Sequence, residues 1–449
     1  MFNIFNRKKE INMNKIDLYI QNVYKNNPLW FTEEVEKPTN SCRIARVWGL
    51  KEYLSGRHKV LGRQDIKYKE KEYKVKKLIL NNAKSILNFH ATYLTGKPIS
   101  LTGEENVVRE IESVYKFGGF NETDFKLTSN VCKYGDGFEY IYKDNGIIKS
   151  KIISSEDSYP VFNDGGDYIA FIEHWTNTDS ISYWNVYYED RVEEWTNEGS
   201  EVHKIDEYDN ESGLPIHYYF SSDEDSRYGE SLLNDIVPIL DELEDLLSKM
   251  GDSIYTLSLN PLLLTTGQAI EGTVNKDGVG YNVALEVGSN MQYVSANMDY
   301  STIKLYLDTL QNNLNMCAYM PSILGGNGNI ANVSEVSLKL LYQLADVYAM
   351  ITEKAMMKGF RDRFRIIKKM LDIESGEYIG VTFNYARPQN ASELLENIHK
   401  QFEMGAISKR SIIEKSPITV DVDMELDRIK KEGVKMENEG EVTEGLDFY

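Results

Sequence analysis

Few residues in this chain have the types and spacing of a known catalytic or ligand-binding motif. The nearest matches are to motifs that bind nucleotides. A P-loop needs G-x4-G-K-[ST], in which backbone amides hold phosphate. The nearest match, Thr95-Gly96-Lys97-Pro98, has Ala91 in place of the first Gly and Pro98 where an amide is required. Gly326-Asn327-Gly328-Asn329-Ile330-Ala331 fits G-x-G-x-x-A, but a predicted helix precedes it where a dinucleotide site needs a strand. A glycine-rich connection between two helices explains it better.

Metal ligands and catalytic nucleophiles are equally hard to find. The six His residues form no H-E-x-x-H pair, and none has a Cys at metal-ligand spacing. The acidic run 221–225 lacks the Gly and Glu that a calcium loop needs at its sixth and twelfth positions. No G-x-S-x-G elbow occurs, and 70 Asp and Glu residues are too many to nominate one acid–base pair. The sequence therefore predicts no cofactor, no metal site and no enzymatic activity.

Length and composition indicate a globular protein with several packed subregions. The 449 residues include 41% hydrophobic and 51 aromatic residues, so disorder throughout is excluded. The net charge of −20 argues against a protein that grips DNA or an acidic membrane along its whole surface. Three widely spaced Cys residues fit a reducing compartment, and the chain has neither a secretory signal nor a membrane-spanning apolar run. We expect a soluble protein made in a cytoplasm, without a membrane partner.

Charge is unevenly distributed along the chain. Residues 43–84 hold 13 Lys and Arg against 4 Asp and Glu, a local balance of +9 that leaves −29 for the rest. This basic stretch is either a solvated face or a contact with an acidic partner or neighbouring subunit. Residues 421–449 hold 10 acids against 4 bases, and the last of them, 434–449, are expected to form a flexible acidic tail.

The pattern between about 100 and 220 is typical of β structure. Segments such as GFEYIY, YIAFIEHW and SYWNVYYEDRVEEW are rich in β-branched and aromatic residues. Turn signals separate them, at Asp144-Asn145-Gly146, Asn163-Asp164-Gly165-Gly166 and Asn197-Glu198-Gly199. The region is therefore predicted to be mainly β, with antiparallel strands.

Apolar residues recur at helical spacing from about residue 228 onward. They predict a helix over 228–258, which carries many acids, and a second over 302–320. Pro238 is expected to kink the first helix or to mark its start. The segment between them, 259–301, carries Gly residues and alternating patterns, and is expected to form a small β insertion.

A longer helix is predicted over 332–371, where Asn332 and Glu335 form a capping box. At a rise of 1.5 Å per residue it would span about 58 Å, and Gly359 is a candidate bend. A strand within 372–390 and short helices over 391–433 are expected to follow. The whole pattern indicates an α+β protein.

Several blocks, in order, make the chain resemble the portal proteins of long-tailed bacteriophages. They begin with YLSGRHKVL at 53–61 and LILNNAKSILNFHATYLTGKPIS at 78–100, and continue with YGDGFE at 134–139 and GLPI at 213–216. The last block, 388–432, has a Gly-x-Ile-Ser turn before a helix and then a Glu-rich helix. The order of these blocks over about 380 residues is more specific than any single motif.

The resemblance implies a subunit with a wing, a two-helix stem, a clip, a channel loop, a long helix and a helical crown. The segments of this chain would be an N-terminal arm 1–30, wing 31–227, first stem helix 228–258, clip 259–301, second stem helix 302–320, channel loop 321–331, long helix 332–371, wing strand 372–390, crown 391–433 and tail 434–449. The wing is expected to have helices near 41–95.

The function implied by the resemblance is a ring of about twelve subunits at one capsid vertex. Double-stranded DNA would pass through it during packaging and ejection. The implied partners are other copies of the chain, the terminase large subunit, the major capsid protein, the scaffold and a head–tail connector. The protein would lie in the virion, and in the host cytoplasm during assembly. The alternative is a non-enzymatic acidic helical scaffold or assembly protein of a virion.

Two sets of residues are candidates for contact with DNA in such a channel. Acids of the first stem helix could line it and repel phosphate: Asp241, Glu242, Glu244, Asp245 and Asp252. Residues of the channel loop could move around DNA: Ser322, Gly325, Gly326, Asn327, Gly328 and Asn329. Alternatively, the acids solvate an ordinary helix or pair with the 43–84 bases of a neighbour, and the loop is a plain connection.

Overall fold

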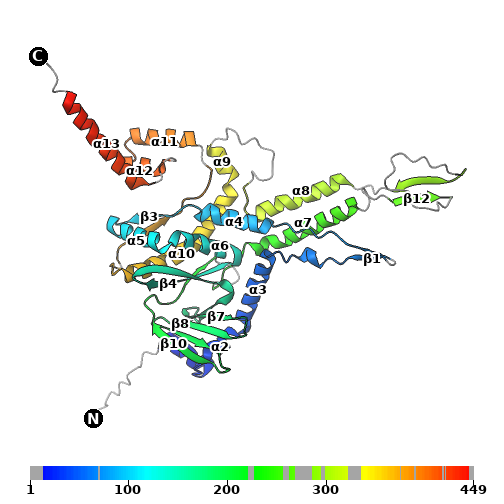
Figure 1. Cartoon of the computed structure of the whole chain (residues 1–449), viewed down its shortest axis with the longest axis horizontal. Helices are drawn as coiled ribbons and strands as arrows, with labels where there is room; N and C mark the ends of the chain where they lie inside the picture. The colour runs from blue at the N-terminus through cyan, green and yellow to red at the C-terminus, as the bar shows by residue number, and fades with distance from the viewer. Residues whose placement is uncertain are drawn as a thin grey trace, which may run out of the picture. The chain divides into compact units, whose positions relative to one another are not determined.

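A computed structural model of the chain describes residues 14–68, 71–220, 227–255, 262–267, 286–294, 299–321, 335–374, 376–388, 391–416, 419 and 421–443 (Figure 1). The chain divides into two compact units. One unit comprises Met1–Gly325 and Leu344–Ala386, and the other comprises Gly326–Gln343 and Arg387–Tyr449. Both helices and strands are present in the first unit, which confirms the predicted α+β class.

The first unit begins with helices that belong to its core. They are α1 (Lys15–Tyr24), α2 (Trp30–Val35) and α3 (Pro38–Leu54), with a 3₁₀ turn at Lys59–Gly62. Ile16, Trp30 and Phe31 are at most 3% exposed and pack in one cluster with Ile172 and Val186 of the sheet. Residues 14–30, which belong to the predicted N-terminal arm 1–30, therefore pack against the strands through their apolar side chains. Residues 1–13 lie outside the described part.

Antiparallel strands form two main sheets of the first unit. The five-stranded sheet has the order β10–β9–β8–β7–β6, with β6 at Ser158–Phe162, β7 at Tyr168–Thr176, β8 at Ser182–Tyr187, β9 at Arg191–Thr196 and β10 at His203–Asp209. The three-stranded sheet has the order β11–β4–β5, with β4 at Asp136–Asp144, β5 at Ile147–Ile153 and β11 at Ile216–Tyr219. The predicted turn at Asn145-Gly146 joins β4 to β5, and both residues have the positive φ that a tight hairpin needs.

Three small pairs of strands complete the described sheets. They are β1 (Ile66–Tyr68) with β2 (Lys71–Tyr73), β3 (Ser100–Gly103) with β14 (Ile379–Thr382), and β12 (Leu262–Thr266) with β13 (Asn290–Val294). The last pair agrees with the predicted β insertion within 259–301. The predicted strand within 372–390 is β14, and it joins a strand near residue 100.

The prediction of mainly β structure is wrong for the first third of 100–220. Residues Glu105–Gly118 and Phe120–Tyr134 form helices α5 and α6, which follow α4 (Asn82–Thr95). Val107, Ile111 and Tyr115 recur every four residues and are buried on one face of α5. This helical period is present in the sequence, but β-branched composition masked it.

Both helices predicted over 228–258 and 302–320 are present, the first with shorter bounds and the second shifted by two to three residues toward the N-terminus. They are α7 (Leu233–Ser253) and α8 (Tyr300–Cys317), which lie side by side (Figure 1). Pro238 lies inside α7 rather than at its start. Because it stands in the second turn of the helix, it removes only one hydrogen bond, to the carbonyl of Asn234.

The predicted long helix is interrupted. It consists of α9 (Glu335–Leu341) and α10 (Gln343–Met370), with a turn at Tyr342. Gly359 lies within α10 and does not interrupt the helix. Instead it lets the Tyr218 ring approach, since a Cβ at this position would lie 2.1 Å from Tyr218 Cε1. The capping residue Asn332 lies outside the described residues.

The second unit contains α9 and three C-terminal helices, α11 (Ala391–Glu403), α12 (Lys409–Lys415) and α13 (Val422–Thr443). The predicted turn before α12 is confirmed, since Gly405 has φ +69° and the Ser408 side chain accepts a hydrogen bond from the Ser411 amide. Because α13 continues to Thr443, the expectation of a flexible tail over 434–449 is wrong for 434–443.

Candidate functional site: the helix pair α7 and α8

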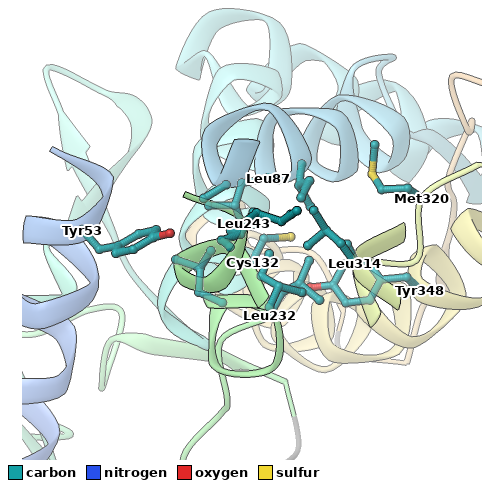
Figure 2. Close-up of a cluster of buried hydrophobic side chains, with 14 residues drawn as sticks. Tyr53, Leu87, Cys132, Leu232, Leu243, Leu314, Met320 and Tyr348 are labelled. Carbon is teal, nitrogen blue, oxygen red and sulfur yellow. The ribbon is translucent and has the colours of Figure 1, made fainter. Parts of the chain in front are cut away.

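Helix α7 is amphipathic, and its apolar face is buried in a cluster to which α4, α6, α8 and α10 also contribute. Leu240 and Leu243 on this face are at most 3% exposed. They share a hydrophobic cluster with Leu314 of α8, and Figure 2 labels Leu243 and Leu314 in it. Half-buried Leu307 and Leu310 of α8 pack against this cluster. Fully burying one such Leu contributes about 1.5–3 kcal/mol. This cluster fixes which face of α7 remains for other contacts.

A buried carboxylate fastens α7 to the chain segment 57–80. Glu244 is fully buried, and its Oε1 lies 2.7 Å from Nδ1 of His58. The same oxygen accepts a hydrogen bond from the Leu80 amide at 2.7 Å. The Tyr53 ring stacks on His58 with 4.1 Å between ring centroids. Glu244 is therefore removed from the candidate channel acids, because protein groups surround its carboxylate and it does not face solvent.

Two further candidate acids bind the same segment from the flank of α7. Asp252 Oδ2 accepts from Arg63 Nη2 at 3.0 Å, and its Oδ1 accepts from the Lys76 amide at 2.7 Å. Asp245 lies 3.5 Å from Arg63 Nε and 2.5 Å from Lys249 Nζ. The bases of 43–84 thus meet acids of α7 within one chain. Pairing with a neighbour is not needed to explain these two acids.

The remaining two candidate acids differ in their exposure. Asp241 is half-buried, and burial raises its pKa above the ordinary value, while nearby Lys59 and His58 oppose the shift. Glu242 is exposed, and its Oε1 accepts a hydrogen bond from the Tyr306 hydroxyl at 3.1 Å. Among the five candidates, Glu242 is therefore the acid most free to meet a ligand.

The two ends of α8 are fixed by different devices. At its start the Asp299 side chain accepts from the amides of Ser301 and Thr302, and hydrogen bonds from their hydroxyls help lower its pKa to about 2. At its end His90 Nε2 lies 2.7 Å from the Ala318 carbonyl oxygen. Burial lowers the pKa of His90 to about 4, so the neutral ring donates this hydrogen bond.

The candidate channel-loop residues follow α8 directly. Tyr319 has a positive φ of 51°, and Met320 donates its amide to the Asn315 carbonyl, which ends the helix. Ser322, Gly325, Gly326, Asn327, Gly328 and Asn329 lie outside the described residues. Their predicted role stays a prediction.

A buried charge network in the first unit was not found from the sequence. Arg363 of α10 is fully buried, and its Nε donates to Glu139 at 2.9 Å while its Nη1 contacts Asp124. Tyr218 donates its hydroxyl to Glu139 at 2.6 Å. Burial raises the pKa of Asp124 to about 6, although Arg363 opposes the shift. The sequence did contain one indication of this network: Arg363 is a charged residue next to the apolar positions Phe360 and Phe364. Glu244 stands in the same way among the apolar positions of α7.

The described part of the chain offers neither a metal-binding group nor a membrane-spanning helix. Within it, no group of three or more His, Cys, Asp or Glu residues could hold a metal ion. Among its helices, none is both long and apolar enough to cross a membrane. The helices α7 and α8 supply packing surfaces and, among the five candidate acids, one exposed acid, Glu242.

The sequence matches a known protein family over most of its length. The family model described as "Phage portal protein, SPP1 Gp6-like" matches residues 37–439. The chain therefore belongs to this family of phage portal proteins, which confirms the resemblance found in its sequence. A comparison with curated proteins returned no match.

Solved structures show a weaker likeness. The neck of an empty gene transfer agent particle computed with C6 symmetry has a TM-score of 0.49 and 11% identity, over 73% of this chain and 90% of the other. The virion of the native particle gives 0.45 and 13%, over 73% and 86%. The neck of the native particle computed with C12 symmetry gives 0.44 and 12%, over 74% and 88%. At these TM-scores the likeness carries no conclusion about function or assembly.

Proposed function

We propose that this portal protein forms a ring of about twelve subunits at one capsid vertex. Double-stranded DNA enters through the ring during packaging and leaves through it during ejection. The observation that carries the proposal is the family match over residues 37–439. The ring lies in the virion and assembles in the host cytoplasm.

The described elements can be assigned to the parts of such a subunit. In this proposal α7 and α8 are the stem, β12 and β13 belong to the clip, and residues 321–331 are the channel loop. The sheets and α1–α6 form the wing, together with α10 and β14, and α11–α13 form the crown. The clip side docks the terminase large subunit and then the head–tail connector, while the wing meets the major capsid protein and scaffold. No catalytic role is proposed for any residue.

The charge of the chain suits a conduit through which DNA slides without binding. Each Lys or Arg on a phosphate would add attraction, whereas acids repel the duplex and reduce friction. The chain carries −20, and α7 keeps Glu242 exposed beside Asp241. We therefore place Glu242 at the channel surface. Asp245 and Asp252 contribute less, because Arg63 offsets their charge.

Electron microscopy of single particles and native mass measurement of the purified chain test the ring. The expected result is a ring with a central hole and a mass about twelve times the 51.6 kDa of one chain. A thirteen-fold ring also supports a conduit. A compact dimer or tetramer without a channel contradicts the proposal.

Charge reversal at Glu242 tests the role of the exposed acid. Glu242→Lys is expected to slow DNA packaging, because a ring of added positive charges would attract the duplex. Glu110→Lys makes the same charge change on exposed helix α5 and is the matched control. Equal packaging rates for the two variants would remove Glu242 from the channel.

The loop is tested through its glycines. Replacing Gly325, Gly326 and Gly328 by Ala is expected to impair DNA packaging or retention and to leave the ring intact. Particles of normal yield and DNA content would identify the segment as a plain connection.

A further inference from the structure

The hairpin formed by β1 and β2 is basic, and it exposes apolar side chains. Residues 63–77 hold seven Lys and Arg against three Asp and Glu. Ile66 and Tyr73 lie opposite each other in the strand register and are 61% and 50% exposed. Among the described strands, β1 and β2 pair with each other and with no third strand. An isolated two-stranded hairpin is marginally stable in water, so this one needs a covering surface.

The hairpin is nevertheless anchored at its base. The Val75 amide donates to Asp65 at 3.0 Å, which closes the hairpin. Arg63 and the Lys76 amide bind Asp252 of α7, and the Leu78 amide donates to Ser248 of α7 at 2.9 Å. These contacts fix where the hairpin stands on α7.

The hairpin and α8 occupy nearly opposite flanks of α7. At 100° per residue, Asp245 and Asp252 lie about 120–180° around the helix from Leu240 and Leu243, which belong to the cluster that α7 shares with Leu314 of α8. The order across this part of the chain is therefore hairpin, α7, α8. Its two free edges are the hairpin and the side of α8 that faces away from α7.

That free side of α8 carries apolar and acidic residues together. Leu305, Asp308, Asn312 and Met316 recur every three or four residues and form one stripe of the helix. Leu305 and Met316 are 68% and 65% exposed, and Asp308 is exposed. The stripe lies opposite Leu307, Leu310 and Leu314, which face the core cluster. Nothing within the described chain covers it.

We propose that the strand pair β1 (Ile66–Tyr68) and β2 (Lys71–Tyr73) docks on this α8 stripe of the next copy of the same chain. In a head-to-tail ring, each copy repeats the order hairpin, α7, α8. The hairpin of one copy then lies against the exposed side of α8 of the next copy. Ile66 and Tyr73 then contact Leu305 of the next copy. Lys74, which directly follows Tyr73, pairs with Asp308 of that copy. The inference rests on the proposed ring and names one surface that closes it.

Charge and polarity favour a second copy over DNA as the occupant. A duplex would satisfy the lysines, but its phosphate backbone offers no apolar cover for Ile66 and Tyr73. In each copy, the residues outside 43–84 carry a net charge of −29. The neighbouring copy therefore offers an acidic surface to the basic hairpin. Both hairpin and stripe combine an apolar patch with charge, and the signs are complementary.

The test compares self-association of the full-length wild-type chain with that of four variants, by native mass and analytical ultracentrifugation. Lys74→Glu reverses the charge of the hairpin, and Ile66→Ser with Tyr73→Ser removes its apolar pair. Lys116→Glu makes the same charge change at an exposed site of α5 and is the control. Lys74→Glu combined with Asp308→Lys exchanges the two charges. Thermal unfolding of each variant verifies that it is folded.

Both hairpin variants are expected to need about tenfold more protein for half-assembly, a change of about 1.4 kcal/mol for each contact. The control should assemble as the wild type does, and the exchanged pair should recover assembly. Unchanged rings in both hairpin variants would overturn the proposal, as would failure of the exchanged pair to recover. Intact rings that retain less DNA would instead assign the hairpin to DNA. A wild-type chain without rings would contradict the proposed function itself, and this inference with it.

Discussion

Helices α10 and α7 are both held by buried charges, but the two regions differ in how completely the chain covers them. Arg363 of α10 is enclosed by Asp124 and Glu139 within the first unit. In α7, Glu244 is enclosed in the same way, whereas Glu242, two residues earlier, is exposed. Its partner α8 buries few side chains apart from Leu314. The charges around Arg363 are therefore compensated within the chain, while the α7–α8 pair keeps exposed surfaces.

The largest expected effect is at Arg363. Arg363→Met leaves Asp124 and Glu139 buried without a positive partner, and we expect a loss of about 3–5 kcal/mol in the free energy of unfolding. Denaturant unfolding measures this loss. Arg365→Met is the control, because the Arg365 side chain is 75% exposed and its loss should change stability by less than about 0.5 kcal/mol.

The same variant has a pH dependence of known sign. Without Arg363 the pKa of Asp124, already raised to about 6 by burial, rises further. The folded variant then binds more protons than the unfolded chain, so its stability falls as pH rises from about 4 toward 7. The deficit relative to the wild type should therefore be larger at neutral than at acidic pH. A deficit independent of pH would mean that lost packing, not buried charge, causes it.

Glycine substitutions compare the packing of the two helices directly. Gly359→Ala places a Cβ against the buried Tyr218 ring, and we expect a loss of about 2–3 kcal/mol from overpacking. In Gly251→Ala of α7, the added Cβ would lie 3.5 Å from Lys76 Cγ and 3.9 Å from Lys76 Cβ, which are ordinary contacts. The free energy of unfolding of this variant should increase by up to about 1 kcal/mol, because Ala has a higher helix propensity than Gly. Calorimetry that shows the same sign for both would contradict the difference in packing.

These two glycines show where sequence reasoning ends. The apolar stripes predicted α7 and α8, and the Asn145-Gly146 signal predicted a hairpin, because each pattern is local. The partner of Gly359 lies 141 residues earlier in the chain, and Arg363 meets Glu139 over a separation of 224 residues. A helical period shows which face is buried, but not what covers it.

Prediction from the sequence met the same limit at the candidate channel acids. Their sequence pattern placed Glu242 and Glu244 in one acidic helix, although the two differ completely in burial. The difference depends on His58 and Leu80, which come from more than 160 residues earlier. Family resemblance was predictable because it needs only the order of motifs, whereas the environment of a single carboxylate requires the fold.

Neutralising the two glutamates of α7 sharpens the comparison within one helix. Glu244→Gln removes the charge that faces His58, and we expect a loss of about 1–2 kcal/mol in unfolding free energy. Glu242→Gln should change stability by less than about 0.5 kcal/mol, because its side chain is exposed. Denaturant unfolding of both variants measures the difference. Equal losses would mean that the buried pair contributes nothing specific.

The smallest expected effect is at the start of α8, where the helix depends on its own cap. Asp299→Ala should speed amide exchange at Ser301 and Thr302 and leave the wing unchanged, because the lost hydrogen bonds are local. Asn312→Ala, on the exposed side of α8, should leave these amides protected. Because the folded pKa of Asp299 is lowered to about 2, its contribution is present above the ordinary carboxyl pKa and is lost as pH falls through about 2. Asp299→Asn should keep the cap without this titration, so unprotected amides in that variant would show that charge, and not hydrogen bonding, fixes the helix start.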